Sequence, residues 1–138
     1  KIEEEILKLI IPFKLLSYNA YYRNTKSGHR VKTGAGLAYD EELSIFFEDN
    51  AAALGHFRKD LDLSKDILEF KIQNFNTNYY IKDKSRLNDT AGDIDNYVKV
   101  LQDKLFKALD YNDARVKRLI VEEEDSDTDY AIIELNIL

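Results

Sequence analysis

The sequence predicts an α+β fold: a mixed β-sheet with two main helices on one face, in the order β-α-β-β-α-β-β. Three observations lead to this prediction. The chain has 138 residues, about the size of one compact domain. Two long segments carry apolar residues at helical spacing, and several shorter ones are apolar or alternate between apolar and polar residues, as strands do. Because no repeat or linker interrupts the chain, we expect one domain over residues 1–138.

The first third of the chain predicts a strand, a long loop and a helix. Residues 5–11 are rich in β-forming residues and end at Pro12, which cannot donate a hydrogen bond to a neighbouring strand. Residues 17–34 are polar and basic, and a loop of this length in a compact domain usually binds something. Residues 36–57 have the apolar spacing of one helical face. The apolar positions of this helix are Tyr39, Leu43, Phe46, Phe47, Ala51 and Leu54.

The middle of the chain predicts two strands and a second loop. Residues 68–73 alternate between apolar and polar side chains, which indicates a strand with one buried face. The chain is expected to turn at residues 76–78 and to return as a short strand over residues 79–81. A polar loop follows over residues 83–92.

The last third predicts a helix and two strands. Residues 94–109 have a second amphipathic pattern, and Asp93 is well placed to cap that helix at its N-terminus. Strands over residues 116–123 and 130–138 close the chain, joined by an acidic turn.

The composition limits the chemistry. Without cysteine, the chain can have no disulfide, thiolate-ligated zinc, iron–sulfur cluster or thiol nucleophile, and the isolated His29 and His56 disfavour a histidine-rich metal site. Any metal is therefore expected to be hard and bound by oxygen. No apolar run approaches the ~18 residues that span a bilayer, and the first residues lack the features of a secretion signal. We expect a cytoplasmic protein that does not enter membranes.

Charge is distributed unevenly along the chain. The formal net charge is −6, which argues against a general polyanion binder, yet residues 13–39 contain no acid. The cations of this basic loop can contact phosphates without reading bases, and its tyrosines can stack on unpaired bases. Alternatively, the loop is a solvated surface and the tyrosines cover the sheet edge. The candidate DNA-binding residues are Arg23, Lys26, His29, Arg30, Lys32, Tyr21 and Tyr22.

The second helix carries the candidate catalytic residues. At ~100° per residue, Asp95, Lys99 and Asp103 form one polar stripe. Asp93 lies at the loop end of this helix, and Asp113 lies just beyond its other end. If the following strand pairs near the helix N-terminus, Asp93, Asp95 and Asp113 would converge.

Converging carboxylates repel one another unless a cation lies among them, and Mg²⁺ is commonly held by such oxygens. A magnesium site of this kind can activate a water for attack on a phosphodiester, while Lys99 neutralises charge that develops on the phosphate. Asp103 would orient Lys99 or a metal-bound water. The alternative is that each acid is structural, as a helix cap, a turn residue or part of an exposed i, i+4 ladder.

With this motif, the sequence resembles the RusA family of Holliday junction resolvases, endonucleases that cut four-way DNA junctions. The matching residues are Asp93-Ile-Asp95-Asn96, Lys99, Asp103 and Asn112-Asp113, together with Asn19-Ala-Tyr21-Tyr22-Arg23 and His29-Arg-Val31 in the basic loop. Many members carry an Asp-Asp pair where this chain has Asn112-Asp113, which leaves Asp113 as the expected ligand.

The resemblance implies a homodimeric endodeoxyribonuclease that makes paired nicks in four-way junctions during DNA recombination and repair. Its metal would be Mg²⁺, with Mn²⁺ as a possible substitute, bound by Asp93, Asp95 and Asp113. Lys99 would be the catalytic lysine, and Asn96 and Asp103 would lie beside the ligands. The host would be a bacterial or phage-infected cell. Two other functions remain open: a non-catalytic DNA-binding or assembly module, and a flap or fork nuclease with the same metal site.

Overall fold

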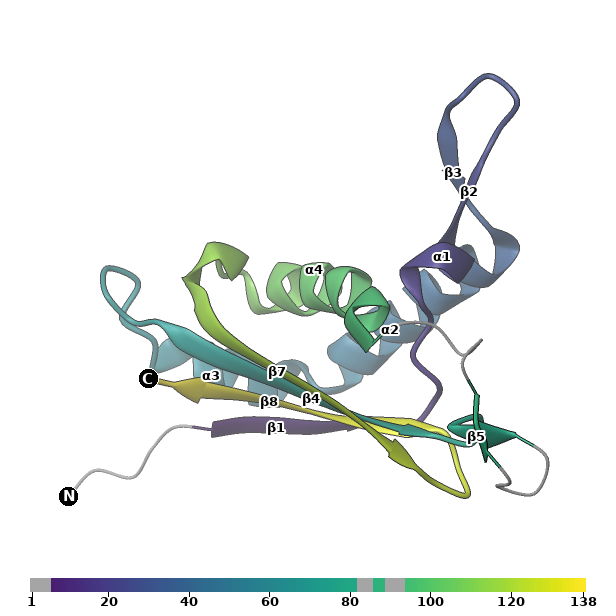
Figure 1. The fold of residues 1–138 in the computed structure, drawn as a ribbon. Helices are drawn as coiled ribbons and strands as arrows, with labels where there is room; N and C mark the ends of the chain where they lie inside the picture. Colours follow the sequence, from purple (N-terminus) through teal and green to yellow (C-terminus); the bar gives the residue numbers. More distant parts are fainter. Residues whose placement is uncertain (1–5, 82–85, 89–93) are drawn as a thin grey trace.

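A computed structural model describes residues 6–81, 86–88 and 94–138. A four-stranded mixed sheet forms one layer, and helices cover one of its faces (Figure 1). The strands, in spatial order, are β1 (Ile6–Ile11), β8 (Tyr130–Ile137), β4 (Leu68–Asn76) and β7 (Val116–Asp125). The predicted α+β class is confirmed.

The helices differ in length and several are short. They are α1 (Tyr18–Tyr21), α2 (Gly34–Asp49), α3 (Ala51–Lys59), α4 (Val98–Leu109) and the 3₁₀ turns η1 (Ile94–Tyr97) and η2 (Asp113–Arg115). Two small hairpins complete the fold: β2 (Tyr22–Asn24) with β3 (Arg30–Lys32), and β5 (Tyr80–Ile81) with β6 (Arg86–Leu87). In the parts of the chain that are described, none of these helices has the length and apolar character needed to cross a membrane.

The direction of the strands determines where α4 lies. β8 pairs antiparallel with both β1 and β4, whereas β4 and β7 are parallel. A parallel pair needs a crossover connection, and α4 provides it. The helix therefore runs back along the sheet, from the end of β4 to the start of β7.

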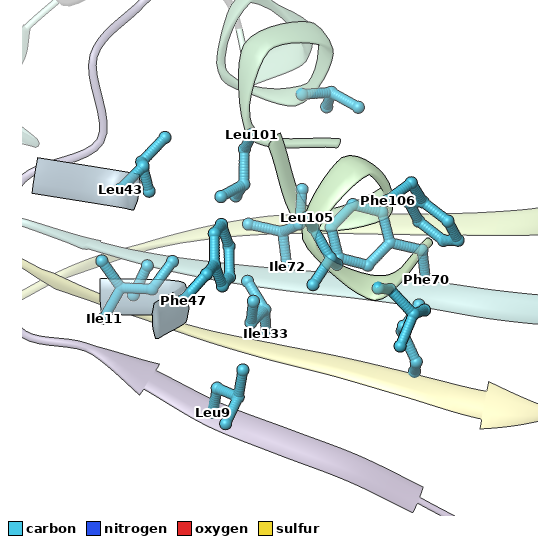
Figure 2. Close-up of a cluster of buried hydrophobic side chains, with 14 of the residues drawn as sticks. Leu9, Ile11, Leu43, Phe47, Phe70, Ile72, Leu101, Leu105, Phe106 and Ile133 are labelled. Atoms are coloured by element: carbon cyan, nitrogen blue, oxygen red, sulfur yellow. The ribbon is translucent and has the colours of Figure 1, made fainter. Parts of the chain in front are cut away.

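The core lies between this sheet and the helical layer (Figure 2). Alternate side chains of β4 point toward the helices, and Phe70 and Ile72 are fully buried. From α4, Leu101 and Leu105 are also fully buried, which accounts for the apolar periodicity of that segment. The ring of Phe106 meets Phe70 edge to face, with centroids 6.2 Å apart. This packing holds the polar side of α4 toward solvent.

Three local predictions need correction. The expected helix over residues 36–57 is two helices that meet at Asn50, where the backbone leaves helical values (φ −109°, ψ 19°) and the side chain donates to the Phe46 carbonyl at 2.8 Å. The loop over residues 17–34 contains α1 and the β2–β3 hairpin. The short strand that was expected to return from β4 pairs with β6 outside the main sheet.

Candidate functional site

Two members of the predicted polar stripe, Lys99 and Asp103, lie together on α4. Lys99 and Asp103 are both exposed, and the Lys99 ammonium lies 3.3 Å from Asp103 Oδ1. Their i, i+4 spacing places them on one side of the helix, as predicted. Asp95 precedes them in η1 and is exposed, and Asn96 beside it is half-buried.

Asp95 and Asp113 lie at opposite ends of α4. η1 packs against β7. Burial and the carboxylates of Glu123, near the end of that strand, and Asp129 raise the pKa of the Tyr97 hydroxyl. The 12 residues of α4 span roughly 18 Å from that point. η2, which begins with Asp113, lies just before the start of β7.

Hydrogen bonds hold the residues that follow the C-terminal end of α4 beside the start of β4. The Tyr111 hydroxyl donates to the Asp66 carbonyl at 3.2 Å, and Arg115 donates to the same oxygen at 3.1 Å. The condition for convergence, that the strand after α4 pairs near the helix N-terminus, is therefore not met. Within one chain, the structure does not bring Asp95 and Asp113 together. Asp93 lies outside the described residues.

Asp113 borders an open groove of about 430 Å³ at the C-terminal end of α4. Asp103, Lys107 and Asp110 line the same groove. Asp110 ends the helix in the left-handed conformation, with φ 55°. The Asn112 side chain accepts a hydrogen bond from the Ala114 amide at 2.9 Å and caps η2, which gives it a local structural role.

Across the described ranges, no three acidic or histidine side chains lie close enough to hold a metal ion. Among the described candidates, Asp95 and Asp113 have the carboxylate oxygens that suit Mg²⁺, but they do not lie together within one chain. A site that includes both ends of α4 would need ligands from a second copy.

The basic loop forms a hairpin that stands away from the body of the protein (Figure 1). Its turn closes with the Thr25 amide donating to the His29 carbonyl at 2.7 Å, and Gly28 adopts φ 85°, which favours a residue without a Cβ. The exposed side chains of the hairpin include Arg23, Lys26 and His29. The structure therefore presents these predicted DNA-binding groups to solvent.

Arg30 and two tyrosines form the root of the hairpin. The Arg30 guanidinium lies 5.1 Å from the centre of the Tyr18 ring and 5.5 Å from that of Tyr22, and it donates a hydrogen bond to the Tyr18 hydroxyl. These side chains border a pocket of about 230 Å³ with Asn19, Arg23 and Asn24.

Tyr21 does not belong to this exposed surface. Its side chain is 3% exposed and packs edge to face on Tyr22 and Tyr39. For Tyr21, this placement favours the alternative in which the ring packs on the protein over the one in which it stacks on DNA bases.

Sequence reasoning missed a polar cluster behind the hairpin. Asp40 on α2 accepts hydrogen bonds from the Tyr21 hydroxyl and from Lys32, whose Nζ lies 2.6 Å from Oδ2. Lys104 Nζ on α4 lies 3.3 Å from the other carboxylate oxygen, Oδ1. Lys32, one of the predicted DNA-binding residues, is thus held by Asp40. The only signal in the sequence is that Asp40 is the first acid after the basic segment.

The hydrogen bonds within this cluster determine which of its side chains are charged. Burial raises the pKa of Asp40, but the hydrogen bonds from Lys32, Tyr21 and Lys104 outweigh it and hold the pKa below the usual value. Burial and the hydrogen bond to Asp40 raise the pKa of the Tyr21 hydroxyl to about 12. The hydrogen bond to Asp40 also raises the pKa of Lys32. At neutral pH, Asp40 is therefore anionic and its partners keep their protons.

The described chain combines a helix with exposed acids, whose oxygens suit a hard metal ion, with a projecting basic hairpin that can contact phosphates. The family model for endodeoxyribonuclease RusA matches residues 12–137. The chain therefore belongs to the RusA family of Holliday-junction-resolving endodeoxyribonucleases, metal-dependent enzymes that act on branched DNA. Among curated proteins, no sequence gives a significant match.

Proposed function

We propose that the protein works as a homodimer that resolves four-way DNA junctions by paired, Mg²⁺-dependent nicks, in the cytoplasm of a bacterial or phage-infected cell. The observation that carries this proposal is the extent of the family match, which includes both the acidic helix α4 and the basic hairpin.

The proposed metal ligands are Asp93, Asp95 and Asp113. Because α4 separates Asp95 from Asp113 by roughly 18 Å, one chain cannot supply both carboxylates to a single ion. We infer that each site takes Asp93 and Asp95 from one copy of the chain and Asp113 from the other. This division gives the dimer a chemical role, because neither copy alone would hold the metal.

The bound metal would supply Lewis-acid stabilisation and a nucleophile at neutral pH. Lys99 would neutralise charge on the scissile phosphate. In the free protein, Asp103 holds the Lys99 ammonium at 3.3 Å. An exposed pair of this kind contributes little to stability, so Lys99 can exchange Asp103 for a phosphate at small cost.

The hairpin is the proposed DNA-binding arm. Its exposed cations, Arg23, Lys26 and Arg30, contact phosphates and carry no sequence information by themselves. Half-buried Tyr22 at the root remains available to stack on a base that is unpaired at the branch point. Two arms related by a two-fold axis would suit a symmetric four-way substrate.

The proposal is tested by incubating the protein with labelled four-way, three-way and linear DNA of shared sequence, with Mg²⁺, Mn²⁺ or no metal. We expect cleavage of the four-way junction, dependent on metal and in preference to the other substrates. Asp95→Asn should abolish cleavage and leave junction binding intact, because the hairpin is unchanged. Preference for the three-way substrate would indicate a fork or flap nuclease. Binding without cleavage in any metal would indicate a DNA-binding module.

A further inference from the structure

Asp40 lies where three elements meet. Its carboxylate is on α2 and accepts from Lys32 at the end of β3, from Tyr21 on α1 and from Lys104 on α4. The two oxygens have different partners: Lys32 is on Oδ2, and Tyr21 and Lys104 are on Oδ1. With a side chain only 14% exposed, Asp40 is enclosed by these partners rather than by water.

The hairpin needs such an anchor because its two strands pair with each other and not with the main sheet. At its root, the Thr33 amide donates to the Tyr21 carbonyl at 3.0 Å, and the Thr33 hydroxyl donates to the Ala20 carbonyl at 2.6 Å. Gly36 lies against the same Tyr21 carbonyl with no room for a Cβ. These contacts join the hairpin to α2, and Asp40 extends the connection to α4.

The connection reaches α4 beside its polar stripe. Lys104 directly follows Asp103 in the chain, so the two side chains leave the helix about 100° apart. Any rotation of α4 about its axis that moved Lys104 from Asp40 would also turn Asp103 and Lys99. The Asp40 carboxylate therefore contacts both the root of the hairpin and the side of α4 that lies next to the stripe.

We propose that Asp40 is a positioning residue that fixes the angle between the DNA-binding hairpin and α4, so that DNA held by the hairpin meets Lys99 in the orientation needed for cleavage. The inference rests on the proposed function of the hairpin and of α4. Asp40 also occupies Lys32 and so withholds that cation from the DNA. Removing the negative charge therefore has opposite effects on the two steps: it releases a cation for binding and disorders the geometry for cleavage.

Asp40→Asn separates these effects, because the amide keeps the shape of the side chain and loses the charge. Binding of a four-way junction is measured without metal, and cleavage is measured in single turnover with saturating enzyme. We expect the cleavage rate to fall roughly tenfold or more. Junction affinity should stay unchanged or increase. A residue that merely supported the fold would lower affinity and rate together.

Lys104→Met provides a second variant that keeps Asp40 and Lys32 in place. It should lower the single-turnover rate without weakening junction binding. Lys71→Met is the matched control: Lys71 is similarly exposed, 30% against 23% for Lys104, and pairs with Glu122 at 3.9 Å on the sheet face opposite the helices. The control should cleave like the unmodified protein. In the Asp40→Asn background, Lys104→Met should have no further effect, because its partner charge is gone.

Two results would overturn the inference. One is cleavage at the unmodified rate by folded Asp40→Asn or Lys104→Met, with the native thermal transition as the check on folding. The other is a parallel loss of affinity and rate in both. A separate hairpin variant, Arg23→Gln with Lys26→Gln, tests the proposed function itself. If its junction affinity is unchanged, the hairpin is not the DNA-binding arm, and the role proposed for Asp40 fails with it.

Discussion

Two lysine–aspartate clusters involve the same helix, α4, and differ in their exposure to water. Lys99 and Asp103 lie 3.3 Å apart, with side chains 67% and 50% exposed. Lys104 and Asp40 also lie 3.3 Å apart, but their side chains are 23% and 14% exposed. Equal distances do not make these interactions equal, because solvent and salt screen the first pair far more than the second.

The difference in burial assigns different roles to the same residue types. The exposed pair can separate at little cost, so Lys99 is available to a phosphate. The enclosed cluster resists separation, because a broken pair would leave desolvated charges without partners. The polar side of α4 with Lys99 is therefore available to a substrate, and the side with Lys104 connects the helix to Asp40.

The largest expected effect is on catalysis at the exposed pair. Lys99→Met should lower the single-turnover cleavage rate about a hundredfold or more, because it removes a charge that stabilises the transition state. The free energy of unfolding should change by less than about 0.5 kcal/mol. Cleavage assays and urea denaturation measure the two quantities. A large loss of stability would mean that the exposed pair is structural after all.

The next effect is on stability at the enclosed cluster. Asp40→Ala leaves the Tyr21 hydroxyl and two ammonium groups without their acceptor and should lower the free energy of unfolding by about 1–3 kcal/mol. Asp103→Ala, on the exposed side of the same helix, should cost less than about 0.5 kcal/mol. Urea denaturation of both variants compares the clusters directly. Equal losses of unfolding free energy would show that burial does not distinguish the two clusters.

Lowering the pH should weaken the enclosed cluster and reduce the stability of the fold. Although burial raises the pKa of Asp40, its three hydrogen-bond partners hold it below the unfolded value of 3.8. Its contribution to stability is therefore complete above that value and is lost as the pH falls through the lower, folded pKa. Asp40→Asn should reduce the loss of stability between pH 5 and pH 2, measured by thermal unfolding. An unchanged acid profile would show that Asp40 is not paired in solution.

The smallest expected effect concerns a single exposed cation of the hairpin. Lys26→Gln should weaken junction binding only a few-fold at moderate salt. The slope of log affinity against log salt should become shallower by about one, because one fewer counterion is released. Titrations at several salt concentrations measure this slope. Lys32→Gln should change it less, because Asp40 already neutralises Lys32; an equal change would contradict that pairing.

Periodic segments predicted the fold well. The alternation in β4 and the apolar spacing in α4 identify a buried strand face and a buried helix face, and both are confirmed. The hairpin was missed because β2 and β3 have three residues each and few apolar side chains, so no alternation marks them. The helix break at Asn50, with its side-chain hydrogen bond to Phe46, is local and the apolar spacing does not reveal it.

The candidate site was predicted only in part, because its geometry depends on long-range pairing. Lys99 and Asp103 are one helical turn apart, so local spacing placed them together correctly. Lys104 and Asp40 are far apart in the chain and meet through the packing of α2 on α4. The placement of Asp113 depends on β7 running parallel to β4, and strand direction leaves no mark in the residues of either strand.

The proposed reaction depends most on the sharing of the metal site between two copies of the chain. Asp95→Asn and Asp113→Asn proteins can each be assayed alone and then as a mixture that has been allowed to exchange subunits. Each variant alone should be inactive on a four-way junction. If Asp95 and Asp113 act from different copies, the mixed dimer has one intact site and one doubly altered site, and nicking of a single strand should return. If the mixture stays inactive although mixed dimers have formed, each site lies within one chain and the proposed division is wrong.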